Sequence, residues 1–157
     1  MNPPKKLILI VCTGNTCRSP MAECLLKAEQ TKHPELENYS FQSAGLFALE
    51  KQPASRNALL ALKEKNLSLE AHQSQMLTEA LLNEAHLILT MTSSHLDQIL
   101  MQFDIPMEKV CTFSHLTDGE SMDVPDPYGQ ALPAYKSCLA SIEALIPAIV
   151  QALIEKA

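Results

Sequence analysis

The sequence lacks several features that would assign it to common classes of protein. It has no Cys-x2-Cys pair and no usual ligand spacing of histidines, so we do not expect a zinc site. It has no Gly-Lys-Ser or Gly-Lys-Thr triplet, which excludes a Walker-type nucleotide loop. Basic residues are fewer than acidic ones, and the net charge of -6 argues against a nucleic-acid partner. Internal repeats and low-complexity tracts are absent as well.

Long apolar runs are also missing from the start of the chain. Lys5 and Lys6 precede a short apolar stretch, residues 7–12, which is too short for a secretion signal. No run approaches the length of a membrane span, so we expect no membrane partner. The five cysteines are an odd number in a chain that needs no disulfides for stability, which predicts reduced thiols and a cytoplasmic location.

The sequence does contain enough apolar material for one sizeable core. Its 157 residues are 46% hydrophobic, which predicts a single domain over residues 1–157. We expect this domain to be a monomer.

Apolar runs that predict strands alternate with segments of helical periodicity. The expected strands are 7–11, 39–43, 86–91 and 109–113, and the expected helices are 20–31, 55–65, 93–103 and 134–155. This alternation predicts an α/β fold: a single-domain, doubly wound, four-stranded parallel sheet with helices on both faces. Ligands bind such sheets beyond the carboxyl ends of the strands, where Cys12 lies. Pro147 predicts a kink in the last helix.

The most informative segment follows the first apolar run and reads Cys12-Thr13-Gly14-Asn15-Thr16-Cys17-Arg18-Ser19. A short loop between a strand and a helix points backbone N–H groups inward, and the helix N-terminus adds partial positive charge; together they bind phosphate. Arg18 would close the ring with a planar guanidinium that grips two phosphate oxygens. Cys12 would lie at the bottom, where the thiolate is favoured and attacks phosphorus. Gly14 and Asn15 tolerate the positive φ that such a loop requires.

A second chemical element is Asp126, which stands between Pro125 and Pro127. Taken alone, this pattern indicates a solvated turn. Transfer of a phosphoryl group to sulfur, however, needs an acid that protonates the departing oxygen or nitrogen. No other carboxylate in the chain has so rigid a frame, which makes Asp126 the candidate acid.

These segments resemble a known family, the low-molecular-weight protein tyrosine phosphatases, and in particular the bacterial branch that includes protein-arginine phosphatases. Residues 11–23 resemble the family signature, and the triplets at 43–45 (Ser-Ala-Gly) and 126–128 (Asp-Pro-Tyr) recur at the separations that the family uses. The resemblance implies that Cys12 is the nucleophile. It also implies that Asp126 is first the acid and then the base for the water that hydrolyses the phosphocysteine.

The resemblance implies supporting roles for other residues. Ser43 and His72 match family positions that hold Asn15 and the loop through hydrogen bonds. Ser19 is expected to donate a hydrogen bond to the Cys12 thiolate. The expected pocket wall consists of Thr16, Phe47, Leu49 and Tyr128. The remaining histidines form no discernible constellation, and we expect them to be structural or solvated: His33, His86, His95 and His115.

Three functions fit these residues. The first is a phosphatase acting on phosphorylated protein side chains, with phosphotyrosine and phosphoarginine as rival substrates. The second is an arsenate reductase, but the expected relay helix at 93–103 has no cysteine, which counts against it. The third is a non-catalytic phosphate-binding or redox-sensing module, which needs neither a nucleophile nor an acid. None of the three implies a metal or an organic cofactor.

Two features of the loop bear on substrate and regulation. Thr16 favours phosphoarginine slightly, because the arginine-directed relatives have threonine where tyrosine-directed ones often carry a larger aliphatic residue. Acidic residues near the expected mouth could add attraction for a cationic leaving group: Asp118, Glu120, Asp123 and Asp126. Cys17 lies five residues after Cys12, which predicts a disulfide that traps the oxidised nucleophile.

Overall fold

The computed structural model describes residues 4–117 and 123–156. Its centre is a parallel sheet in the order β2-β1-β3-β4, formed by β1 (Lys6–Cys12), β2 (Tyr39–Gly45), β3 (Ala85–Thr90) and β4 (Val110–Thr112). The α-helices of the described residues are α1 (Arg18–Gln30), α2 (Arg56–Lys63), α3 (Glu79–Glu84), α4 (Ser93–Gln102) and α5 (Leu132–Lys156). Short 3-10 helices lie at Pro34–Leu36, Met107–Lys109 and His115–Thr117. The expected four-stranded α/β fold is confirmed.

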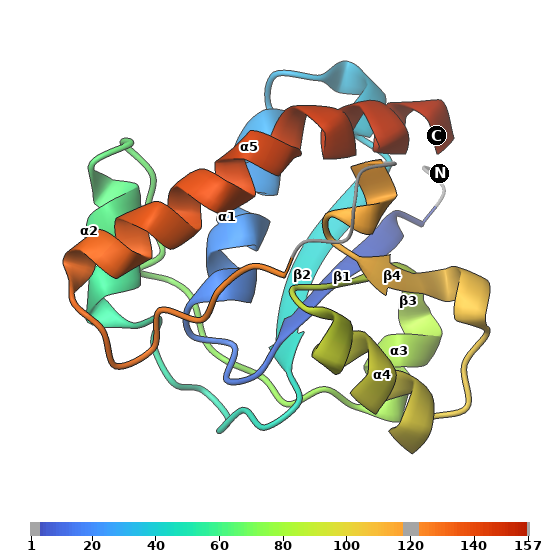
Figure 1. Ribbon diagram of the computed structural model, residues 1–157. Helices are drawn as coiled ribbons and strands as arrows, with labels where there is room; N and C mark the ends of the chain where they lie inside the picture. The colour runs from blue at the N-terminus through green and yellow to red at the C-terminus, as the bar shows by residue number, and fades with distance from the viewer. Residues whose placement is uncertain (1–3, 118–122, 157) are drawn as a thin grey trace.

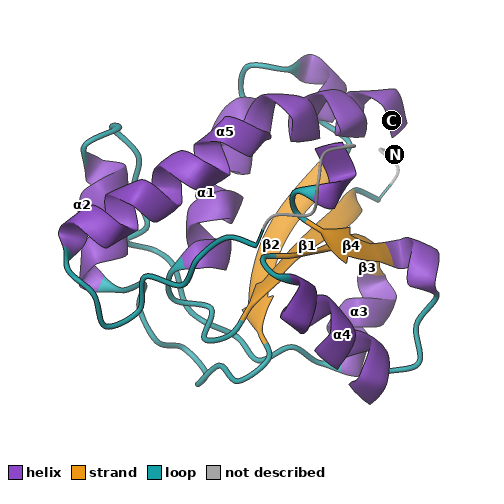
Figure 2. Ribbon diagram, in the orientation of Figure 1, coloured by secondary structure: helices purple, strands orange, loops and turns teal. Residues whose placement is uncertain are grey.

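The alternation of side chains along β1 explains why helices cover both faces of the sheet. Ile8 and Ile10 belong to one buried cluster, whereas Leu7 and Leu9 belong to another. Residues of α1, α2 and α5 complete the first cluster, and residues of α3 and α4 complete the second. The two helix layers lie on opposite sides of the strands in Figure 1 and Figure 2. A strand buried on both faces reads as a continuous apolar run, which is how β1 appears in the sequence.

Several element boundaries differ from the sequence-based expectation. Helix α1 begins at Arg18 instead of residue 20, so the loop is shorter and Arg18 belongs to the first helical turn. Strand β4 starts only at Val110, because Lys109 ends a 3-10 helix. Helix α3 was not expected, since its six residues are too few to show helical periodicity.

Helix α5 is the longest element and part of the core. Its expected apolar stripe is buried, as Leu139, Ile142, Ile146, Ile149 and Leu153 show. By length and by a mean hydropathy of 1.8 it is also long and apolar enough to cross a membrane, contrary to the sequence-based expectation. Core helices meet the same criterion, and this one packs on α1 and α2. It continues as one helix through Pro147 to Lys156.

The carboxyl ends of three strands meet at one edge of the sheet. Strand β1 ends at Cys12, which is paired with Gly45 at the end of β2, while β3 ends at Thr90. The backbone N–H of Val124 donates to the carbonyl of Met91, 3.0 Å away, and this bond brings the segment containing Asp126 to the same edge. The fold therefore gathers the candidate residues where doubly wound sheets bind ligands.

Candidate active site

The loop between β1 and α1 is held by backbone hydrogen bonds to its neighbours. The carbonyl of Thr13 accepts from the N–H of Phe47 at 2.9 Å, and the carbonyl of Thr16 accepts from the N–H of Ser55 at 2.9 Å. Because these carbonyls point to neighbouring segments, the loop can present N–H groups to its interior. These contacts suit the anion-binding cradle expected from the sequence, which stays a prediction.

Two backbone positions shape this loop. Asn15 has a φ of 58°, the left-handed conformation that its residue type tolerates. Gly14, the other residue that tolerates a positive φ, does not adopt one. The glycine that the loop does require is Gly45: a Cβ there would lie 2.5 Å from the Thr13 oxygen and 3.0 Å from the Asn15 nitrogen. The end of β2 thus approaches the loop too closely for any side chain.

A chain of hydrogen bonds ends on the Cys12 sulfur. The Oγ of Ser19 lies 2.8 Å from Cys12 Sγ, and the Nδ2 of Asn15 donates to the same Ser19 oxygen at 3.0 Å. Since Ser19 accepts from Asn15, its own proton is available for the sulfur. The arrangement suits a sulfur that carries negative charge as nucleophile or as leaving group.

Asn15 is in turn held from behind the loop. His72 donates from Nε2 to the Asn15 carbonyl at 2.7 Å, and the N–H of Gln75 donates to Asn15 Oδ1 at 2.9 Å. Ser43 has partners other than the expected Asn15. Its hydroxyl donates to Glu23 at 2.5 Å, toward α1, and its carbonyl accepts from Gln75 Nε2 at 2.9 Å. Gln75 therefore connects Ser43 with Asn15 and the loop.

Opposing effects act on the pKa of Cys12. Burial raises the pKa of this thiol above its ordinary value and is the largest effect. The hydroxyl and backbone N–H of Ser19, the charge of Arg18 and the N–H of Asn15 all lower it. The expectation that the loop favours the Cys12 thiolate is thus corrected. The effect of burial on the pKa is larger than the combined effect of the hydrogen-bond donors and the Arg18 charge.

Arg18 is a buried cation at the side of the loop, with only 4% of its surface exposed. Its Nη1 donates to the carbonyl of Val124 at 3.1 Å, and its Nη2 donates to Thr13 Oγ1 at 3.4 Å. Nη2 also lies 3.5 Å from Asp126 Oδ2. These contacts fix the plane of the guanidinium, as bidentate binding of a phosphate requires.

The orientation of Asp126 is also fixed. Its Oδ1 accepts from the N–H of Tyr128 at 3.1 Å, a turn that leaves Oδ2 on the side of Arg18. Gln130 donates from Nε2 to the Asp126 carbonyl at 3.2 Å. The side chain is about half exposed, at 48%, so a leaving group and water can both reach it. This position suits proton transfer to and from a bound substrate.

A cavity of about 530 Å³ joins these groups. Its lining includes Cys12, Thr16, Arg18, Phe47, Leu49, Asp126 and Tyr128. The expected wall residues are thus brought together. Phe47, Leu49 and Tyr128 are 65%, 73% and 73% exposed, respectively, so they form the outer rim and not the floor.

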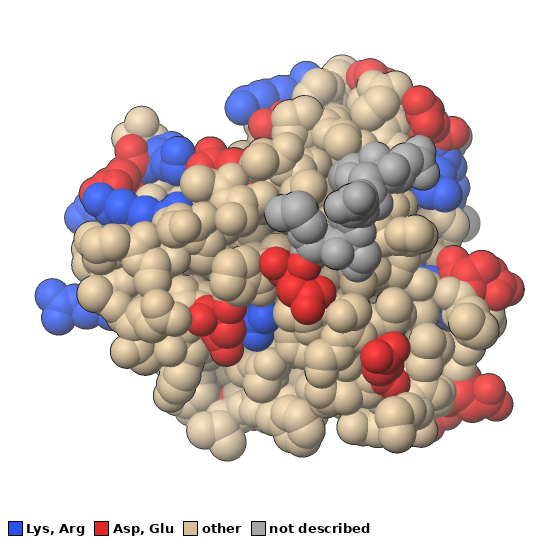
Figure 3. Space-filling view, viewed as in Figure 1, with Lys and Arg blue, Asp and Glu red and all other residues tan. Residues whose placement is uncertain are grey.

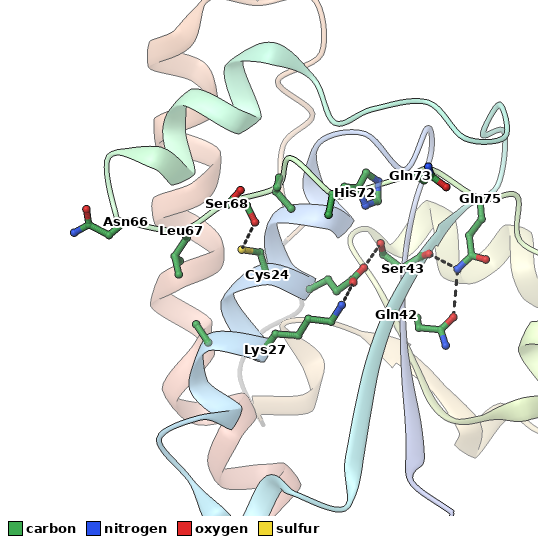
Figure 4. A pocket seen from close by; sticks show the side chains of 14 residues that line it. Cys24, Lys27, Gln42, Ser43, Asn66, Leu67, Ser68, His72, Gln73 and Gln75 are labelled. Atoms are coloured by element: carbon green, nitrogen blue, oxygen red, sulfur yellow. Dashed lines mark hydrogen bonds and ion pairs between the residues drawn. The ribbon is translucent and has the colours of Figure 1, made fainter.

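A second cavity, of about 500 Å³, lies behind the loop and does not include Cys12 (Figure 4). Its polar side chains bond mainly to one another. Lys27 donates to Glu23 at 2.5 Å, and Gln75 donates from Nε2 to Gln42 at 3.4 Å. With Ser43 these residues form a scaffold that supports the loop, and the cavity holds none of the three candidate catalytic groups.

Cys17 is the N-cap residue of α1; it lines the same cavity as Cys12, and its thiol contacts the residue before α2 and a residue of α5. Its Sγ lies 2.9 Å from Ser55 Oγ and donates to the Tyr135 hydroxyl at 3.6 Å. All five cysteines are free. The pairing with Cys12 stays a prediction for the oxidised protein.

The sequence-based reasoning missed His95. It is expected from the sequence to be structural or solvated, with no place in the site, whereas in the structure it is 4% exposed and its Nε2 lies 2.8 Å from Thr13 Oγ1. The position in the chain could have indicated this, because His95 is in the first turn of the helix that follows β3. The end of β3 lies at the same edge of the sheet as Cys12.

The acidic residues near the mouth play different parts. The Asp123 carboxylate accepts from the N–H of Ser93 at 2.8 Å, at the start of α4, so its role is partly structural. Asp118 and Glu120 lie outside the described residues. In the view of Figure 3, basic side chains lie mostly at the edges of the molecule, and acidic ones also lie near the middle of the face.

Comparisons with known proteins agree with this geometry. The family model described as low molecular weight phosphotyrosine protein phosphatase matches residues 7–157. A protein-arginine-phosphatase of Bacillus subtilis is 42% identical over 88% of this chain and 91% of its own. The low molecular weight protein-tyrosine-phosphatase Wzb of Escherichia coli is 38% identical over 87% of each. A solved structure of the YwlE arginine phosphatase, a mutant with a phosphorylated active-site serine, matches with a TM-score of 0.86 and 39% identity over 92% of this chain and 93% of that one.

Proposed function

Because the chain belongs to the low molecular weight phosphotyrosine protein phosphatase family, we propose that it hydrolyses phosphotyrosine or phosphoarginine side chains of proteins through a phosphocysteine on Cys12. The observation that carries this proposal is the convergence of Cys12, Arg18 and Asp126 on one cavity. The phosphorylated serine in the active site of the related mutant supports a covalent intermediate at the nucleophile.

The first half of the reaction transfers the phosphoryl group to sulfur. The loop N–H groups and the Arg18 guanidinium hold the phosphate oxygens, and the Cys12 thiolate attacks phosphorus. A P–S bond forms while the bond from phosphorus to the departing oxygen or nitrogen breaks. Asp126 gives its proton to that departing atom.

The second half returns the enzyme to its starting state. Asp126, now a carboxylate, takes a proton from a water molecule that attacks the phosphocysteine. A P–O bond forms, the P–S bond breaks and inorganic phosphate leaves. The Ser19 hydroxyl, 2.8 Å from the sulfur, stabilises the thiolate as it departs.

We propose a preference for phosphoarginine with phosphotyrosine activity retained. Thr16 lines the cavity. Its side chain is shorter than that of isoleucine and so leaves room near the scissile bond, and its hydroxyl is a polar partner there. A phosphoguanidinium is polar and branched beside phosphorus, whereas a phenyl ring has only apolar edges there. The Asp126 carboxylate also adds attraction for a cationic leaving group. Differences of this size shift specificity by about 1–3 kcal/mol, so the preference is graded.

The test is phosphate release from a phosphotyrosine peptide and a phosphoarginine peptide, measured side by side. Thr16→Ile should lower kcat/KM on the phosphoarginine peptide by roughly tenfold or more and spare or raise it on phosphotyrosine. Thr16→Val is the matched control, because it removes the hydroxyl without adding length. Equal changes on both peptides would mean that Thr16 only supports the loop, and phosphotyrosine would then be the preferred substrate.

We further propose that the phosphatase is a single domain over residues 1–157 that acts as a cytoplasmic monomer on phosphorylated proteins. The match of the family model to residues 7–157 supports the single domain. The five free cysteines support the cytoplasmic location. The net charge of -6 supports the absence of a nucleic-acid partner. The mechanism itself uses no metal or organic cofactor.

A further inference from the structure

His95 is a buried polar side chain that the catalytic steps above do not use. It is 4% exposed, and its backbone is fixed at the start of α4, where its N–H donates to the N-cap residue Thr92 at 3.1 Å. One ring nitrogen, Nε2, lies 2.8 Å from Thr13 Oγ1. The other, Nδ1, is buried without a hydrogen-bond partner among the described residues. An apolar side chain could fill this space without leaving a nitrogen unpaired.

Thr13 connects His95 to the phosphate-binding arginine. The hydroxyl oxygen of Thr13 accepts from Arg18 Nη2 at 3.4 Å. A threonine hydroxyl has one proton and two lone pairs, so it can bond to Arg18 and to His95 at the same time. The residue Thr13 is exposed at the mouth, and without His95 its hydroxyl would be free to rotate away from the guanidinium.

The charge state of His95 suits this contact. Burial, and next the charge of Arg18, lower the pKa of His95 to about 4, although Asp123 and Asp126 oppose the shift. The ring is therefore neutral near pH 7. A neutral ring adds no second cation beside Arg18, so it can hold Thr13 without repelling the guanidinium.

We infer that His95 is a positioning residue for Arg18: through the Thr13 hydroxyl it fixes the guanidinium in the plane that grips a phosphate dianion. This inference rests on the proposed function, since it assigns to Arg18 the task of binding the phosphate group. It predicts that His95 and Thr13 act as one unit. Removing either contact should weaken phosphate binding, and removing both should weaken it no further.

The experiment measures the affinity of the purified full chain for inorganic phosphate. Two methods give this affinity: titration calorimetry, and competitive inhibition of aryl phosphate hydrolysis by phosphate. Thr13→Val deletes the hydroxyl and keeps the shape of an exposed side chain, so it tests the contact even where a change at the buried His95 disturbs folding. Thr13→Ser keeps a hydroxyl and serves as its control. His95→Leu deletes the ring nitrogens, and His95→Gln keeps a polar atom near the position of Nε2.

We expect Thr13→Val and His95→Leu each to weaken phosphate binding by roughly threefold to tenfold, the effect of one hydrogen bond. The double variant should match the single ones. Thr13→Ser and His95→Gln should bind phosphate more tightly than Thr13→Val and His95→Leu, respectively. Rescue by the polar variant at each position is not expected of a side chain that only fills space.

Two outcomes would overturn the inference. If the losses in the double variant multiply, the two residues act separately. If Thr13→Val binds phosphate as tightly as the parent chain, the hydroxyl does not position Arg18. Failure of the parent chain itself to bind phosphate would instead overturn the proposed function, so the two failures can be told apart.

Discussion

At the scale of single residues, the sulfur of Cys12 is controlled by the groups that donate to it. Burial raises the pKa of Cys12, and the Ser19 hydroxyl is the first among the groups that lower it. The reactive species is the thiolate, so the fraction of active enzyme at a given pH depends on this balance.

Ser19→Ala should therefore raise the pKa of Cys12 above that of the parent chain. The thiolate loses a hydrogen bond that the neutral thiol needs less, so deprotonation moves to higher pH. The pH dependence of inactivation by iodoacetamide measures this shift. Ser43→Ala is the control, because Ser43 donates to Glu23 and not to the sulfur, and it should leave the pKa in place. An unchanged or lower pKa in Ser19→Ala would contradict the assignment.

Asp126→Asn should slow the reaction most for substrates with basic leaving groups. An amide cannot supply the proton, and the reference pKa of a tyrosine phenol is about 10 whereas that of a guanidinium is above 12. We expect kcat/KM, which reports the transfer of the phosphoryl group to sulfur, to fall by roughly 100-fold or more on a phosphotyrosine peptide and only slightly on aryl phosphates with acidic phenols. Asp123→Asn is the control, since its side chain can still accept from Ser93. A loss in kcat/KM that does not vary with leaving-group pKa would argue against Asp126 as the acid.

The sequence was most informative about site residues that lie close together in the chain, because their spacing indicates their roles. Cys12, Arg18 and Ser19 could be assigned because a single loop fixes their spacing, and the structure brings all three together with Asp126. His95 could not be assigned in this way. Its partner Thr13 is 82 residues away in the chain, so only the fold shows the contact.

At the scale of elements, the loop depends on how closely β2 approaches it. A Cβ at Gly45 would lie 2.5 Å from the backbone oxygen of Thr13, which cannot move without distorting the loop. The parallel sheet was accessible from the alternation of apolar runs and helical segments, because alternating strands and helices build parallel sheets. The close approach was not, since it depends on the register between Cys12 and Gly45.

Gly45→Ala should therefore lower the free energy of unfolding by about 1–3 kcal/mol, as overpacking does in well-packed regions. Chemical denaturation measures this change. Gly14→Ala is a matched control in the same loop: its Cβ would meet only Thr16 Oγ1, at 3.7 Å, and no positive φ is involved. We expect the control to change stability by less than about 1 kcal/mol. Equal effects at both glycines would show that the approach of β2 does not constrain the loop.

The loop also predicts a response to oxidation. Peroxide converts the Cys12 thiolate to a sulfenic acid, and the Cys17 thiol then attacks it, releasing water and forming a disulfide. For this step Cys17 must leave its contacts with Ser55 and Tyr135. Mild peroxide should give a Cys12–Cys17 disulfide that thiols reverse, as detected by mass spectrometry. Cys12 found as sulfinic acid with Cys17 still free would refute this.

At the scale of the whole molecule, the positive charge of the loop and the negative net charge have opposite effects on the approach of a phosphate group. The chain carries -6 overall, which disfavours the approach of a phosphate dianion. The buried Arg18 and the N–H groups of the loop oppose this within the cavity. The same arrangement leaves acidic groups beside the mouth, where a cationic leaving group would be attracted.

The sequence predicted the overall architecture better than the details of the long helix. The apolar stripe of α5 was evident from its periodicity, and Tyr39 anchors the helix by donating to the Leu153 carbonyl at 2.8 Å. The helix is nevertheless apolar enough on average to resemble a membrane span. Only the packing on α1 and α2 shows which of its residues serve the core.

The central claim is that Cys12 carries the phosphoryl group during turnover. The most direct measurement is acid quenching of Asp126→Asn during turnover of p-nitrophenyl phosphate, followed by mass spectrometry. This variant should still form the intermediate, because the leaving group is a weak base, but it should hydrolyse the intermediate slowly. The account predicts a phosphoryl group on Cys12 and none when Cys12→Ala is added. Continued turnover with Cys12 unmodified, or a phosphoryl group on another residue, would contradict it.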